Sequence, residues 1–375
     1  NIRPKKLGRA SRLAFVDHCG SVPRDFDEDV PVALILKSPG DVDMAGIAAL
    51  SKALQKPVGV VSRAIYQTPS VLMRGIDPRH RDELGEHCAA LGLDVTFGPN
   101  DVVLPLDPVR YDVGLHVNES ACIPEATGIL ARLLGVGPDK AFRLLATPPG
   151  LILGDVSRAA ADVLAQRFGR GCTVSAAVSG EGPFDLFLPE NARIDRELEE
   201  RCAGRRGLVM LALDAQEARE IFPRLPKGAA RLIPRALLRF DVVLMPREKV
   251  AETAVAWLQA ETGGSQTEVR RMLAHAPIAL REALDFMEAA VAQAASAAAG
   301  VPTEIEAHGF LHNDIVVTEA PDRAALEDVL SAAGLNMPVR LPGRIAENLS
   351  DLDARWLAHR LDAAGVRFLF QESAQ

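Results

Sequence analysis

The apolar run Val32-Ala-Leu-Ile-Leu-Lys37 opens the stretch over residues 32–98 that decides the fold. A run of this kind, closed by Ser-Pro-Gly, is typical of a buried strand followed by a turn. Apolar residues at spacings of three and four then predict a helix over 44–55. A Pro and a Gly end that helix, and a second helix is predicted over 60–67, where a Thr-Pro pair stops it.

The second half of this stretch predicts one more helix and a returning strand. Asp77-Pro78 combines an N-cap residue with proline at the first helical position, so a third helix is expected to start there, after a loop. Gly92 ends this helix, and residues 93–97 alternate in polarity as a strand does. The predicted unit is therefore strand, helix, helix, helix, strand.

The same order of elements recurs along the chain, which predicts an α+β fold built as a tandem array of about five small modules. The third copy is predicted to be degenerate, because it is short and Leu208 to Leu213 looks like an extra strand. The predicted divisions are an N-terminal arm over 1–29, module 1 over 30–98, module 2 over 110–178, a degenerate module 3 over 183–238, module 4 over 239–308 and module 5 over 312–372.

The later copies add specific expectations. In module 2, Ser157 is predicted to be the N-cap of the third helix. In module 3, residues 216–222 resemble a second helix, and the strand over 240–244 either starts module 4 or serves both modules. A long third helix is predicted over 281–299 in module 4. The second helix of module 5 is predicted to be shortened and to end near Pro342.

Several motifs resemble the C-terminal domain of the bacterial ribosomal stalk protein, a fold shared with the small adaptor of the Clp protease. Gly135-Val136-Gly137 stands where the stalk family has a Gly-Leu-Gly break, and residues 267–277 follow its second helix down to the final Ala-Pro. Ala364-Gly365 matches the Ala-Gly that ends the third helix. The resemblance implies docking modules, in which the surface of the first two helices holds helices of a partner protein.

Composition excludes several broad classes. A hydrophobic fraction of 48% excludes general disorder, and a net charge of -8 argues against a nucleic-acid binder driven by overall charge. No apolar run reaches the length of about 18 residues that a membrane span needs. The cysteines lie far apart in no zinc spacing, which predicts a cytoplasmic protein; they are Cys19, Cys88, Cys122, Cys172 and Cys202. The resemblance to the bacterial stalk-protein domain implies a bacterial-type protein.

The polar clusters give no positive case for catalysis. The densest is Asp77 to Glu83, which includes His80; we interpret it as the solvated first turn of an exposed helix. His87 with Cys88 matches no recognised ligand spacing, and Ser179 to Pro183 is interpreted as a linker. No P-loop, dinucleotide, GxSxG or HExxH motif is present. The sequence therefore predicts no catalytic residue, no cofactor and no metal.

These observations favour a non-catalytic scaffold or adaptor that binds partner proteins through the helical faces of its modules. Two alternatives stay open. One is an enzyme, or a subunit of one, with a site at a module junction where His80, His87, His116 or His275 converge; the other is a self-assembling structural protein. The basic arm could target the chain, dock on an acidic surface or be a solvated tail. The predicted partner-binding residues are Lys52, Lys56, Arg63, Arg132, Lys140, Arg143, Arg270 and Arg271.

Overall fold

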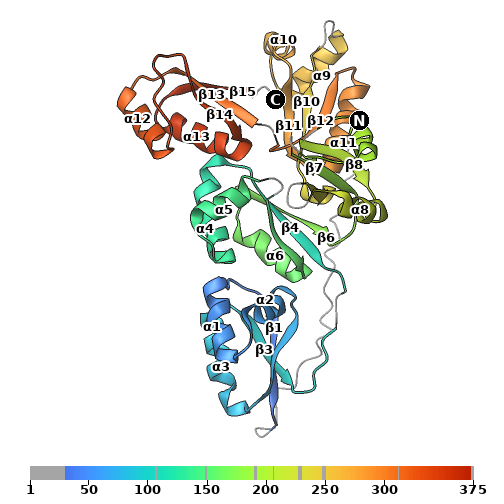
Figure 1. The fold of residues 1–375 in the computed structure, drawn as a ribbon, viewed down its shortest axis with the longest axis vertical. Helices are drawn as coiled ribbons and strands as arrows, with labels where there is room; N and C mark the ends of the chain where they lie inside the picture. Colours follow the sequence, from blue (N-terminus) through green and yellow to red (C-terminus); the bar gives the residue numbers. More distant parts are fainter. Residues whose placement is uncertain are drawn as a thin grey trace, which may run out of the picture.

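The chain folds into an α+β array of five small three-stranded antiparallel sheets interleaved with helices (Figure 1), as the sequence predicts. In every sheet the first strand of the module lies between the other two. The predicted arm over 1–29 lies outside the residues described. The computed structural model describes residues 30–372 except 106–107, 148–149, 190–191, 206, 227–229, 247–250 and 311.

Module 1 shows the complete pattern and one strand that the sequence did not predict. β2 occupies residues expected to form a loop, and it pairs antiparallel with β1. β2 was missed because only Leu72 and Ile76 of its seven residues are buried, so the strand carries no continuous apolar run. The elements are β1 (Val32–Ser38), α1 (Met44–Leu54), α2 (Val58–Tyr66), β2 (Ser70–Ile76), α3 (Arg81–Ala90) and β3 (Asp94–Pro99).

Module 2 repeats this order, again with an unpredicted middle strand. Ser157 is the N-cap of the third helix, as predicted, and its side chain accepts a hydrogen bond from the backbone N–H of Ala160 at 3.3 Å. The elements are β4 (Tyr111–Val117), α4 (Ile123–Leu134), α5 (Pro138–Leu145), β5 (Leu151–Val156), α6 (Arg158–Arg167) and β6 (Cys172–Val178).

Module 3 is degenerate because one α-helix stands where modules 1 and 2 have two. The strand over 208–213, predicted as an extra strand, is its middle strand. Residues 216–222 occupy the position of the third helix, so their assignment to the second helix was wrong. Module 3 also has its own return strand, β9, so the strand over 240–244 belongs to module 4 alone. The elements are β7 (Phe184–Leu188), α7 (Arg196–Cys202), β8 (Gly207–Leu213), α8 (Ala215–Ile221) and β9 (Arg231–Pro234).

Module 4 corrects the long helix predicted over 281–299. Its first residues belong to the middle strand, and the helix starts only at Phe286, after Asp285. Asp285 and Glu288 form a capping box, which fixes the start of the helix at this point. The elements are β10 (Phe240–Leu244), α9 (Glu252–Thr262), α10 (Gln266–Ala274), β11 (Ile278–Leu284), α11 (Phe286–Ala298) and β12 (Thr303–Ala307).

Module 5 also has a single helix before its middle strand. The shortened second helix expected to end near Pro342 does not form, because Pro338 and Pro342 lie within the same short segment and proline disrupts a helix interior. The elements are β13 (His312–Glu319), α12 (Arg323–Ala332), β14 (Gly343–Ser350), α13 (Asp351–Ala363) and β15 (Arg367–Glu372).

Modules 1, 2 and 5 form a stack in which a third helix packs on the preceding module (Figure 1). Arg167 of α6 donates to the backbone carbonyls of Gly40 and Val42 in module 1. Arg355 of α13 donates in the same way to the carbonyl of Asn118 in module 2, at 3.2 Å. The apolar core is continuous across modules 1 and 2. The stack therefore repeats one kind of contact, although module 5 is remote from module 2 in sequence.

Modules 3 and 4 pack against each other through aromatic side chains. The rings of Phe187 and Phe310 lie 5.8 Å apart, and the guanidinium of Arg235 lies 4.3 Å from the ring centre of Phe286. His116 of module 2 hydrogen-bonds the carbonyl of Leu237 at 2.8 Å. This contact joins module 3 to the stack. Residues of modules 2, 4 and 5 line one pocket, so these three modules meet at one junction.

Candidate functional site

An aspartate near the start of the first strand recurs in modules 2 to 5, buried in modules 3 and 5 and partly buried in modules 2 and 4. Its carboxylate accepts the backbone N–H of a residue near the end of the middle strand, and that residue has positive φ. A side chain in this left-handed conformation is costly, so the hydrogen bond stabilises a β-bulge. The pairs are Asp112 with Asp155 at 3.3 Å, Asp185 with Ala212 at 3.0 Å, Asp241 with Ala283 at 2.9 Å and Asp314 with Asn348 at 2.9 Å.

Three of these carboxylates take a second partner from the residue that follows the return strand. Asp112 accepts from Ser179 at 2.8 Å, Asp185 pairs with Arg235 at 2.6 Å, and Asp241 bonds His308 at 2.9 Å. Asp314 instead pairs with Arg344 of its middle strand, at 3.1 Å. We call this arrangement the aspartate clasp. Its recurrence with different partners shows that its first role is structural.

Module 1 makes the same clasp with another residue. Ala33 stands where the other modules have aspartate, and the N–H of Gly75 donates instead to the side chain of Asn100 at 2.5 Å. Asn100 directly follows the return strand. The sequence analysis missed the clasp, although Tyr111-Asp112, Phe184-Asp185 and Phe240-Asp241 repeat the signal.

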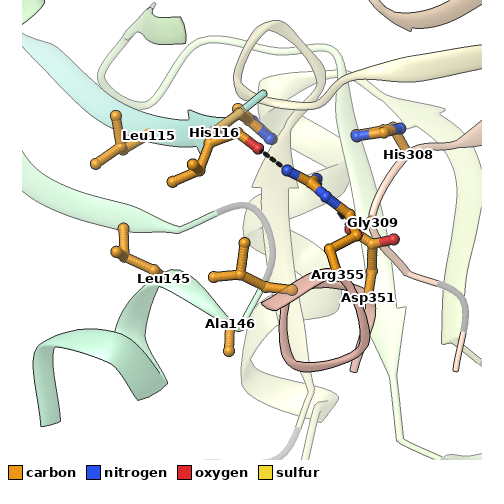
Figure 2. A pocket seen from close by; sticks show the side chains of 10 residues that line it. Leu115, His116, Leu145, Ala146, His308, Gly309, Asp351 and Arg355 are labelled. Carbon is orange, nitrogen blue, oxygen red and sulfur yellow. Dashed lines mark hydrogen bonds and ion pairs between the residues drawn. The ribbon is translucent and has the colours of Figure 1, made fainter. Parts of the chain in front are cut away.

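The clasp of module 4 differs because its partner is a histidine on the wall of a cleft. Nδ1 of His308 lies 2.9 and 3.0 Å from the two carboxylate oxygens of Asp241. The cleft has a volume of about 720 Å³, and Asp351, Arg355 and Phe370 of module 5 also line it. A smaller pocket adjoins it and is lined by the same histidine and arginine, together with His116 (Figure 2). This junction is our candidate site.

Burial and neighbouring charges give the two histidines opposite properties. The pKa of His116 is lowered to about 4, chiefly by burial and also by the charges of Arg239, His308 and Arg355, which together outweigh the hydrogen bond to Leu237 that raises it. His116 is therefore neutral, with its Nε2–H donated to Leu237. For His308, burial lowers the pKa, but the hydrogen bond and charge of Asp241 outweigh it, so the pKa lies above its ordinary value.

The four histidines predicted to converge at a junction do not do so. Only His116 reaches a junction. His80 and His87 line a separate hollow of about 500 Å³ on module 1, and both are exposed. His275 is exposed at the C-terminus of α10. Within the described part of the chain, no group of three or more His, Cys, Asp or Glu side chains is arranged to hold a metal ion.

The eight predicted partner-binding residues are all exposed, but they belong to three modules and form no single surface. Two of them already have partners. Nζ of Lys56 donates to the carbonyl of Leu72 at 2.8 Å, and Arg270 pairs with Glu252 at 2.9 Å. The others extend from the helix pairs without a described bond; they are Lys52, Arg63, Arg132, Lys140, Arg143 and Arg271.

The helix pair of module 1 carries an apolar surface that the sequence analysis did not single out. Val58 is 42% exposed and Val60 is 53% exposed, and a Cβ added at Gly59 would meet no atom within 4 Å. In module 2 the contact lies at the end of the first helix: a Cβ at Gly135, which caps α4 as Gln55 caps α1, would lie 2.7 Å from Cγ of Met44 in module 1. The start of the second helix is open in both modules, and in module 1 it is apolar.

Two further observations concern membrane spans and similarity to known proteins. None of the helices among the described residues is long and apolar enough to cross a bilayer. Comparison with protein-family models, with curated proteins and with solved structures finds no match. The resemblance to the stalk-protein domain therefore stays a prediction.

Proposed function

We propose that this protein is a non-catalytic scaffold or adaptor that binds a partner protein through the helix pairs of its modules. The observation that carries the proposal is the open surface of module 1, formed by Val58, Gly59 and Val60 at the start of α2. We call it the module 1 patch. In module 2 the neighbouring end of the first helix receives Met44 of the same chain at Gly135, which supports the idea that the helix pairs make protein contacts.

Charge favours an acidic, amphipathic partner helix. Lys52, Lys56 and Arg63 are exposed on the helices beside the module 1 patch. Val60 and Arg63 are three residues apart on α2, so they lie on one face of that helix. A helix with apolar residues on one face and acidic residues at its edge would bury the valines and meet the basic side chains. Most binding energy would come from the apolar contacts, while the charges would steer association.

The test is site-specific photo-crosslinking with the full chain. A photoreactive phenylalanine replaces Val60, and the same group replaces Val339 as a control, because Val339 is 98% exposed in module 5. We expect a discrete adduct with the probe at 60 and none at 339. Adding Arg63→Glu to the first variant should weaken the adduct about 3- to 10-fold, since a charge at the rim of an interface contributes modestly.

Two results would contradict the proposal. Identical adducts from positions 60 and 339 would mean that capture is non-specific. An adduct at 60 that survives both Arg63→Glu and Val58→Asp would mean that the module 1 patch does not hold the partner. Circular dichroism of each variant shows whether it remains folded, and residues 58, 60 and 63 are suited to substitution because their side chains are exposed.

A further inference from the structure

We propose that the junction cleft between modules 2, 4 and 5 binds a small organic monocarboxylate, with His308 and Arg355 facing its carboxylate group. This site is separate from the module 1 patch and does not depend on the proposed partner. The cleft of about 720 Å³ falls within the size range of small-molecule sites.

Two carboxylates on the cleft wall are already engaged, and an open hydrogen-bond donor lies beside them. The carboxylate of Asp241 already accepts from His308 and from the N–H of Ala283, and Asp351 pairs with Arg355 at 3.2 Å. By contrast, Nε2 of His308 has no hydrogen-bond partner among the described residues. When the ring is protonated, Nδ1 donates to Asp241 and Nε2 has a hydrogen to donate to a ligand. The complementary ligand group is therefore an acceptor.

Crowded cations around the junction also favour an anion. Figure 2 shows the side chains of His308 and Arg355 near one another at the pocket, and each disfavours the charge of its neighbour. Arg239 adds a third cation close enough to lower the pKa of His116. Nε of Arg239 is buried and makes no hydrogen bond within the described part of the chain. Arg239 does not line the cleft, but an oxyanion placed between His308 and Arg355, which do, would relieve their mutual repulsion.

The walls of the cleft limit the ligand to a single negative charge and an apolar body. Glu282 lies on the wall, is exposed and has no ion-pair partner in the described residues, so it would repel a dianion. Phe370, which is 47% exposed, supplies an aromatic surface, and Ala279 and Ala283 add apolar contacts. These features suit a monocarboxylate with an aromatic or aliphatic body better than a phosphate.

Calorimetric titration of the full chain tests this inference with three probes that share a phenyl ring and differ in charge. Benzoate is expected to bind, whereas benzamide, which lacks the charge, and benzylammonium, which reverses it, are expected to bind at least tenfold more weakly. Binding of benzoate should weaken as the pH rises through the pKa of His308, because the neutral ring has no hydrogen to donate from Nε2. In NMR titrations, benzoate should raise the pKa of that ring.

Variants separate recognition from folding. Glu282→Gln removes an exposed charge and is expected to strengthen benzoate binding about 3- to 10-fold, a gain that a loss of folding cannot produce. Phe370→Ala should weaken it. His308→Gln should weaken it and remove its dependence on pH. A folded chain that takes up no benzoate at 10 mM, tighter binding of benzylammonium than of benzoate, or weaker benzoate binding in Glu282→Gln would each overturn the proposal.

Discussion

The ion pair between Asp185 and Arg235 gives the sharpest test of the aspartate clasp. The Asp185 side chain is fully buried and that of Arg235 is 11% exposed, and the two form a fork with N–O distances of 2.6 and 2.7 Å. Arg235→Met would leave a buried carboxylate with only the N–H of Ala212 as partner. Removing one member of a buried pair costs about 3 to 5 kcal/mol.

Hydrogen exchange is the suitable assay, because a chain of several modules need not unfold in one step. The amide of Ala212 donates to Asp185 from β8, so exchange over residues 207–213 reports the local opening of module 3. A loss of about 3 kcal/mol corresponds to roughly 100-fold faster exchange. Asp185→Asn combined with Arg235→Met removes the unpaired charge and should recover most of the protection.

A control of the same shape lies on the surface of the same module. Arg224 forms a fork with Asp195 at 2.7 Å for both contacts, but both side chains are exposed. Arg224→Met should change exchange far less than Arg235→Met, because water replaces the lost partner. Equal effects of the two substitutions, or no recovery in the double variant, would refute the reasoning about burial.

Three further predictions concern the contacts between modules. The pKa of His116 falls from its usual value to about 4 on folding, so the unfolded chain binds more protons between pH 6.5 and 4. The free energy of unfolding should therefore decrease by up to about 3 kcal/mol as the pH falls through that range. Thermal melts of wild type and His116→Gln at several pH values check this. Ser157→Ala should lower the free energy of unfolding by about 1 kcal/mol, because the N-cap is lost. It also removes a hydroxyl that lies 3.2 Å from the hydroxyl of Thr68 in module 1. Urea unfolding measures the loss. Gly135→Ala should destabilise the contact between modules 1 and 2, because φ is 62° and the new Cβ meets Met44, seen as faster exchange at α1.

The first strands and most helices could be predicted because their signals are local. The run from Val32 to Leu36 is apolar at every position, and caps such as Ser157 mark where helices begin. Only one middle strand, over 208–213, could be predicted, because it is apolar at every position. The others could not, because a residue with positive φ interrupts each of them. Asp155 and Ala283 are examples; neither residue type indicates a strand, and the bulge breaks the alternation that identifies one.

The junction could not be predicted for a different reason. Arg355 donates to the carbonyl of Asn118, which precedes it by 237 residues, so module 5 packs on module 2 although the two are remote in sequence. No local pattern specifies which of five similar modules will meet. The aspartate of the clasp was within reach, since it occupies the same place beside buried apolar residues in several copies, but its partner His308 becomes evident only from the structure.

The position of module 1 at the end of the stack explains the densest polar cluster in the sequence. The third helices of modules 2 and 5 contact a preceding module, and α13 buries several apolar side chains, including Leu352 in the core shared by modules 1 and 2. Among the described residues, no other module packs on α3, which buries only Cys88, while Asp82 and Glu83 in its first turn are exposed. A helix face that meets water is expected to be polar. The Asp77 to Glu83 cluster is thus explained without chemistry, and the exposed apolar side chains of module 1 lie instead on α2.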